Sequence, residues 1–134
     1  MTFKSPIRRD ERGAAAIEFA IAVPVLVTFI WGIFQIGLLL EANAGMQQAL
    51  GEGARYATLY LDSTSDHRPT NAAIKADITN SVFKPGVGTF NVADPVDGVG
   101  YKDLSVTYTM PMDFLMFQGP TVTISKSKRV YVVT

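Results

Sequence analysis

The most constraining feature of the sequence is a run of 22 residues, from Phe19 to Leu40, that carries no charge. About 20 apolar residues are enough for a helix to cross the hydrocarbon core of a bilayer. A buried helix in so small a domain would rarely be as long and as uniformly apolar. The sequence therefore predicts that residues 19–40 are embedded in a membrane, and no later stretch is apolar enough to cross it again.

The charges on either side of this run predict its orientation. The basic residues of the N-terminal leader all precede it, and Glu41 follows it. Because basic flanks stay on the cytoplasmic side of the membrane, we expect a cytoplasmic N-terminus and a C-terminal domain on the other side. The basic leader residues are Lys4, Arg8, Arg9 and Arg12.

Composition excludes several kinds of function. A length of 134 residues corresponds to one domain. The 12 basic and 12 acidic residues cancel, so the basic excess of a nucleic-acid-binding protein is missing. There is no cysteine and only one histidine, His67, which excludes thiol chemistry, disulfides and Cys- or His-rich metal sites. No phosphate-binding glycine loop, HExxH pair or GxSxG motif occurs, so we expect neither an enzyme nor a cofactor.

Three kinds of segment share this outline. A cleaved secretory signal would end near the small residues at 42–44, although its apolar region is usually only about 7 to 15 residues long. An uncleaved anchor would keep its N-terminus. The third kind is an apolar segment that is cut on its N-terminal, cytoplasmic side.

Glu18 helps to choose among these alternatives, because it adjoins the uncharged run. A carboxylate in a membrane segment costs about 2.5 to 3.5 kcal/mol at the centre and less near an end. Glu18 therefore either reaches water at the interface or pairs with a cation in the apolar layer. A free α-amine at Ala14 would be such a cation if the chain were cut after Gly13.

The residues around Glu18 resemble a known processing site. The sequence from Gly13 to Phe19, behind a basic leader and ahead of an unbroken apolar helix, is similar to the processing site of type IV-type prepilins. More narrowly, residues 12–20 followed by Val23-Pro24-Val25-Leu26 resemble the TadE/TadG-like pseudopilins of bacterial tight-adherence (Flp pilus) secretion systems. The resemblance is strongest over residues 9–42 and continues more loosely through residues 51–57.

The resemblance implies a processing step and a set of partners. A prepilin peptidase would cut between Gly13 and Ala14, which would make Glu18 the fifth residue of the mature chain and Phe19 the sixth. The major Flp pilins are very short and often have Tyr as the sixth residue, so Phe19 and the long C-terminal part favour a minor pilin or pseudopilin. The implied partners are the peptidase, other pilin subunits, the inner-membrane assembly platform and the lipid bilayer.

The predicted function is therefore assembly of a Tad/Flp-type pilus, by initiation, priming or a place at the tip, for adhesion or secretion. The chain would cross the inner membrane once and then join the pilus at its base, tip or shaft. The alternative is a signal-anchored or secreted extracytoplasmic binding domain unrelated to pili.

The predicted fold is α+β and pilin-like, with a cleaved leader (1–13), a transmembrane or filament-core helix (14–41) and an extracytoplasmic domain (42–134). An apolar stripe with helical spacing extends the first helix to residue 61, and Pro24 is expected to kink it. The helix also contains glycines, which indicate either looseness or close packing between helices. The stripe is Met46, Leu50, Ala54, Ala57 and Leu61, and the glycines are Gly32, Gly37, Gly45, Gly51 and Gly53.

The rest of the chain predicts a second helix and a sheet of two to three antiparallel strands. The helix is capped by Thr70 or Asn71, runs to about Phe83 and has a stripe of Ile74, Ile78 and Val82. The strands are expected at 89–93, at 104–110, where Pro111 would end the strand, and at 121–133. Lys126 and Lys128 share the apolar face of the last strand, which predicts a break, a bulge or an edge protrusion there. Residues 113–119 read as an apolar loop, and Phe114 to Phe117 could be either core or exposed.

Overall fold

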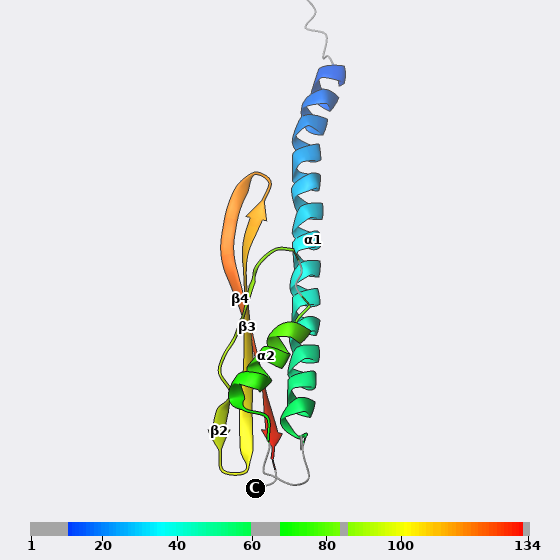
Figure 1. The fold of residues 1–134 in the computed structure, drawn as a ribbon. Coiled ribbons are helices and arrows are strands. Elements are labelled where there is room, and N and C mark those ends of the chain that lie inside the picture. The colour runs from blue at the N-terminus through cyan, green and yellow to red at the C-terminus, as the bar shows by residue number, and fades with distance from the viewer. Residues whose placement is uncertain (1–10, 60–67, 84–85, 133–134) are drawn as a thin grey trace, which may run out of the picture.

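The computed structural model describes residues 11–59, 68–83 and 86–132, and it combines a very long helix with a small sheet (Figure 1). The predicted α+β class is confirmed, although the antiparallel sheet has four strands instead of two to three. The elements are α1 (Glu11–Ala57), α2 (Asn71–Ser81), β1 (Thr89–Val92), β2 (Val96–Gly98), β3 (Tyr101–Phe114) and β4 (Phe117–Tyr131).

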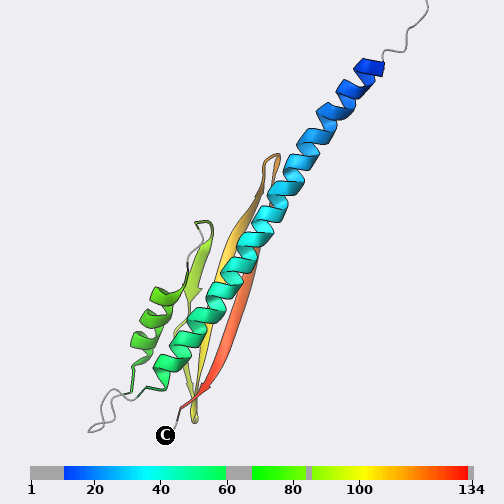
Figure 2. The ribbon, with the colours of Figure 1, turned by 90° about the vertical axis from the view of Figure 1, so that its right-hand side faces the viewer.

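Helix α1 has 47 residues and is about 70 Å long at 1.5 Å per residue. The predicted continuation of the membrane helix into the domain is confirmed as far as Ala57, and Leu61 lies outside the described residues. The helix continues through Pro24, whose carbonyl oxygen accepts a hydrogen bond from the Thr28 hydroxyl at 2.8 Å. The kink at Pro24 stays a prediction. Figure 2 shows that the N-terminal part of α1 projects well beyond the sheet.

Strand β3 is the centre of the sheet. It pairs with β4 along one edge and with β1 and then β2 along the other, always antiparallel. β1 and β2 therefore act as one strand interrupted at residues 93–95, where Pro95 lacks an N–H for the ladder. The sequence did not predict β2, because the strand lies within residues 85–100, whose glycines and prolines favour a loop.

The prediction that Pro111 ends its strand is wrong, since β3 continues to Phe114. Among the described strands, β3 pairs beyond Thr109 only with β4, so a proline is tolerated on the other edge. The β3–β4 register shifts directly after the proline, between Pro111 and Asp113.

The core lies between one face of the sheet and the two helices. On β3, buried side chains alternate with half-exposed serines and threonines, so the opposite face is polar. Helix α2 is capped by Thr70, whose hydroxyl accepts from the Ala73 N–H at 3.2 Å, and it ends at Ser81 rather than near Phe83. Its predicted stripe is confirmed as buried. The principal core side chains are Met46, Leu50, Ile74, Ile78, Val82, Leu104, Val106, Tyr108 and Met110.

Of the three alternatives for Lys126 and Lys128, the break and the bulge are wrong, whereas a protrusion at an edge strand agrees with the position of β4. Both lysines keep regular register with β3, opposite Val106 and Leu104. β4 pairs with β3 alone, so a long side chain on its inner face can pass along the neighbouring helix and reach water with its amine. The Nζ of Lys128 indeed lies 4.0 Å from the position that a Cβ at Gly51 would occupy.

Several glycines of α1 make close contacts with the rest of the chain. A Cβ at Gly53 would lie 2.2 Å from Cγ1 of Ile78, and a Cβ at Gly45 would lie 3.3 Å from the carbonyl oxygen of Phe83. By contrast, no described atom lies within 4 Å of a Cβ built at Gly37. Close packing therefore explains Gly53 and Gly45, and it occurs within this domain.

Candidate membrane and assembly segment

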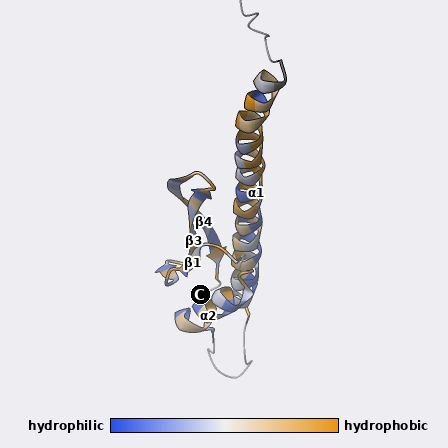
Figure 3. Cartoon of the chain, turned by 90° about the horizontal axis from the view of Figure 1, so that it is seen from above, coloured by the Kyte–Doolittle hydropathy of each residue, from blue (hydrophilic) through white to orange (hydrophobic). Residues whose placement is uncertain are grey.

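The N-terminal half of α1 is apolar and exposed. The helix is long and apolar enough to cross a membrane, and very little of its most apolar part is buried within the chain. Large side chains such as Ile17, Phe29 and Ile30 are 65%, 67% and 57% exposed. Figure 3 shows the strong hydrophobic colour of this part of α1 against a paler and bluer sheet. Such a surface is unfavourable in water and indicates a lipid or protein environment.

The predicted cleavage site lies inside α1. Gly13 and Ala14 are both helical and exposed, because the helix begins at Glu11. Apart from the backbone of the helix itself, no described atom lies within 4 Å of a Cβ built at Gly13, so no described side chain packs against this position. The leader residues Lys4, Arg8 and Arg9 lie outside the described residues, and Arg12 belongs to α1 without a described side chain.

Glu18 and Phe19 follow on the same exposed surface, and the Phe19 ring is 71% exposed. Residues four apart lie on one face of a helix, so Glu18 is on the same face as Ala14. Within the part of the chain that the structure describes, Glu18 has no hydrogen bond or ion pair. The described side chains therefore provide no counter-ion for this carboxylate in an apolar layer.

The sheet meets α1 at a contact that the sequence did not predict. Gln35, which is only 4% exposed, donates from Nε2 to the carbonyl oxygen of Asp113 and accepts from the Asp113 N–H at 3.1 Å. Nε1 of Trp31 donates to the same carbonyl at 2.7 Å. This helix–hairpin contact uses both backbone groups of Asp113 at the register shift, where the ladder to β4 is disturbed. Gln35 is the one side-chain amide in the uncharged run, and this isolated polar group was the sequence signal that could have indicated a buried polar contact.

Replacing Gln35 by leucine should destabilise the domain by about 1 to 2 kcal/mol, because the Asp113 N–H loses its partner and the Asp113 carbonyl keeps only the bond from Trp31. The measurement is the urea midpoint of the detergent-solubilised chain, followed by fluorescence of its single tryptophan. Gln48→Leu, on an exposed position of the same helix, is the matched control and should change stability by less than about 0.5 kcal/mol. Equal midpoints for the two variants would contradict a stabilising role for the contact.

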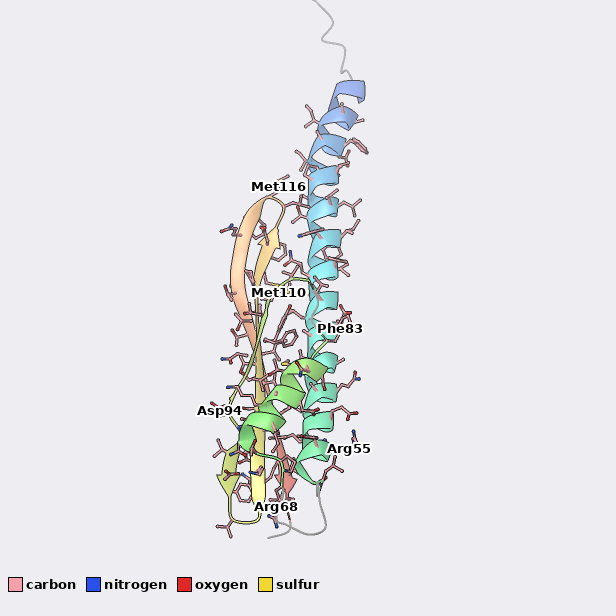
Figure 4. All side chains as sticks on the ribbon, in the orientation of Figure 1. Arg55, Arg68, Phe83, Asp94, Met110 and Met116 are labelled. Carbon is pink, nitrogen blue, oxygen red and sulfur yellow. The ribbon has the colours of Figure 1, made fainter. Side chains whose placement is uncertain are left out.

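Beyond this contact, β3 and β4 close in a two-residue turn, Leu115-Met116. The predicted loop at 113–119 is therefore wrong, and most of its residues are strand. Residues 114–117, called the hairpin tip below, are largely exposed: Leu115 is 65%, Met116 67% and Phe117 58% accessible. The Phe114 and Phe117 rings stack with centroids 4.9 Å apart. Figure 4 shows Met116 at this end of the hairpin, beside α1.

A groove of about 560 Å³ separates the hairpin tip from α1. Its walls are α1 from Pro24 to Ile36 on one side and Phe114, Met116 and Phe117 on the other. Phe114 forms the base, since its Cε1 would lie 3.3 Å from a Cβ at Gly32. Glycine at position 32 thus lets the ring approach the helix.

The charged groups gather at the opposite end of the sheet. Asp103 accepts two hydrogen bonds from Arg129, at 2.7 and 2.8 Å, and the Arg129 guanidinium lies 4.0 Å from the centroid of the Tyr101 ring. Asp97 pairs with Lys102 and also accepts from Asn71 at 2.7 Å. These hydrogen bonds lower the pKa of both carboxyl groups. Over residues 11–59, 68–83 and 86–132 no cluster of acids or histidine could hold a metal ion.

Comparison with known proteins finds a family match for most of α1. The family model described as TadE-like protein matches residues 13–55. This segment is TadE-like. No curated protein and no solved structure matches the chain. The resemblance found in the sequence is thereby confirmed over α1, and it indicates a protein associated with a Tad pilus.

The TadE-like segment divides into two parts with different surroundings. Up to Ile30, its large apolar side chains are exposed, whereas from Trp31 onward it contacts the sheet and then α2. The match therefore includes both the free part of the helix and the part that holds the domain. The sheet itself lies outside the matched residues.

Proposed function

We propose that the chain is a minor pilin or pseudopilin that takes part in assembling a Tad/Flp-type pilus, by initiation, priming or a place at the tip. The observation that supports this most is the TadE-like match, because it covers an apolar helix that its own chain leaves unpacked. A subunit that joins a filament needs such a free apolar helix, since neighbouring subunits can bury it. The role is structural, in adhesion or secretion.

The proposed topology has one membrane crossing, with the N-terminus in the cytoplasm and the sheet domain in the periplasm. Four basic residues precede the uncharged run, which supports this orientation through the positive-inside rule. The partners would be a prepilin peptidase in the membrane, the inner-membrane assembly platform and other pilin subunits.

Leader removal would act as the assembly switch. Cleavage between Gly13 and Ala14 would create an ammonium group at the start of the apolar helix, where the precursor has a peptide bond. Four basic and two acidic residues would leave with the leader, so the mature chain would have 8 basic and 10 acidic residues and a net charge of −2.

The new ammonium would pair with Glu18 of a neighbouring subunit. Glu18 lies about 6 Å further along the helix than Ala14 at 1.5 Å per residue, so two parallel helices offset by about one turn would bring these groups together. A charge-assisted bond is strong where water is excluded. It would also fix the axial register of the helices, because any other offset would leave a carboxylate unpaired in an apolar bundle.

The intact mass of the chain purified from membranes tests this proposal. We expect a mature N-terminus at Ala14, which requires a cut on the cytoplasmic side of the apolar run. A chain that starts at Met1 would indicate an uncleaved anchor, and one that starts at Gly45 would indicate a secretory signal. Either of these results would contradict prepilin processing and favour an extracytoplasmic domain unrelated to pili.

A further inference from the structure

The hairpin tip lies beside the part of α1 that is proposed to cross the membrane. Phe114 packs at Gly32, inside the uncharged run that ends at Leu40. From Ala14 to Gly32 the helix rises about 27 Å at 1.5 Å per residue, which is close to the hydrocarbon thickness of about 30 Å. Figures 1 and 4 show the hairpin tip beside the middle of α1. With Ala14 at one boundary of the bilayer core, the hairpin tip would therefore stand at the other.

A deeper position of the helix would not remove the hairpin tip from lipid. The exposed apolar surface of α1 continues to Leu40, about 12 Å beyond Gly32. If that surface were also immersed, the hairpin tip would lie further inside the bilayer. Every placement that covers the apolar surface of α1 thus brings the hairpin tip to the hydrocarbon boundary or past it.

The distribution of charge along the hairpin fits contact with lipid. Between Asp103 on β3 and Lys126 on β4, the sequence has one charged residue, Asp113. The ion pairs of the sheet lie at its other end, around Asp97 and Arg129. Turns are normally rich in Gly, Asn, Asp and Pro, yet this turn is Leu115-Met116 with a phenylalanine on each side. The carboxylate of Asp113 opposes deep insertion, so the contact is shallow.

We propose that the hairpin tip, residues 114–117, is a second membrane contact that dips into the outer boundary of the bilayer, with acyl chains filling the groove between it and α1. Trp31 lies at the same level and suits this boundary, where tryptophans gather. The helix–hairpin contact would then hold the sheet domain in a fixed orientation on the membrane surface before the subunit enters a filament. The inference rests on the membrane placement of α1 given under the proposed function.

The test is site-directed spin labelling of the full chain in phospholipid vesicles, and the absence of native cysteines makes single labels straightforward. Met116→Cys carries the label at the hairpin tip. Val99→Cys is the matched control, since Val99 is an apolar residue, 98% exposed, in the turn at the opposite end of β3. Ile21→Cys reports on the free part of α1. Oxygen concentrates in hydrocarbon and a polar nickel chelate stays in water, so the ratio of their collision rates with each label measures depth.

We expect the ratio of oxygen to nickel collisions at position 116 to be several-fold higher than at position 99 and lower than at position 21, because the contact is shallow. A lipid-like ratio at 21 with a water-like ratio at 116 would overturn this inference and leave the proposed function intact. A label at 116 that is shielded from both reagents, with spin–spin broadening that grows with protein density, would show that a second copy covers the groove and would also overturn it. Water-like ratios at both 21 and 116 would refute the membrane placement itself.

Discussion

Replacing Glu18 by alanine is expected to leave membrane insertion intact and to abolish incorporation of the chain into a pilus. Removal of a carboxylate makes the segment more apolar, by about 2.5 to 3.5 kcal/mol at most on insertion scales, so insertion should not suffer. Assembly should fail because the ammonium of a neighbouring Ala14 would lose its counter-ion and the helices would lose their register. The measurement compares the chain in membranes with the chain in sheared pili by immunoblotting.

Two further variants separate the proposed pairing from a general effect of charge. Glu41→Ala removes an exposed acid from the far end of the uncharged run and should assemble normally. Glu18→Gln keeps the hydrogen-bonding oxygen but not the charge, so it should assemble poorly if the partner is an ammonium group. Normal piliation of Glu18→Ala would refute the pairing role, and equal failure of Glu41→Ala would show that the effect is not specific to position 18.

Helix α1 could be predicted from the sequence because its signals are local. An uncharged run of 22 residues and a following stripe at helical spacing need no knowledge of the rest of the fold. The same holds for α2, whose Thr70 cap and stripe of Ile74, Ile78 and Val82 occupy adjacent turns. The glycines remained ambiguous, since only the position of α2 shows that Gly53 faces Ile78.

The details of the sheet depend on which strands lie next to one another, and the sequence does not indicate this. Pro111 could not be placed within a strand until β1 was seen to stop pairing at Thr109 and leave an edge open. Lys126 and Lys128 left a break, a bulge and an edge protrusion open, because nothing local indicates that β4 pairs on one side only. Edge position is a tertiary property, and it decided both cases.

The candidate site was only partly predictable for a similar reason. Gly13, Ala14 and Glu18 could be proposed because charge and small residues stand out against an apolar background and resemble a prepilin processing site, and their role stays a prediction. The role of Gln35 was not predicted, because its hydrogen-bond partner, the backbone of Asp113, lies 78 residues later in the sequence and is adjacent only in the folded chain. The exposure of the hairpin tip likewise follows from the length of β3 and β4, which carries the turn beyond the core.

Substitution of valine for Gly53 should destabilise the domain by about 3 kcal/mol or more, by overpacking a filled core. The Cβ alone would lie 2.2 Å from Cγ1 and 2.7 Å from Cδ1 of Ile78, a fully buried side chain on α2. Ile78 cannot turn away, because Met46, Leu50 and Ile74 belong to the same buried cluster. The helices must therefore separate, and the urea midpoint of the detergent-solubilised chain should fall.

Gly51→Val is the control that makes this result specific. It adds the same side chain two residues earlier on the same helix, so the difference in helix propensity between glycine and valine is the same in both variants. There the nearest atom to the new Cβ is the Lys128 amine at 4.0 Å, the flexible end of a side chain, and the change in stability should stay within about 0.5 kcal/mol. If both variants lost stability equally, helix propensity would explain the effect and the close approach of α1 to α2 at Gly53 would be refuted. If only Gly53→Val lost stability, the glycine would be required because it lets α2 pack closely against the TadE-like helix.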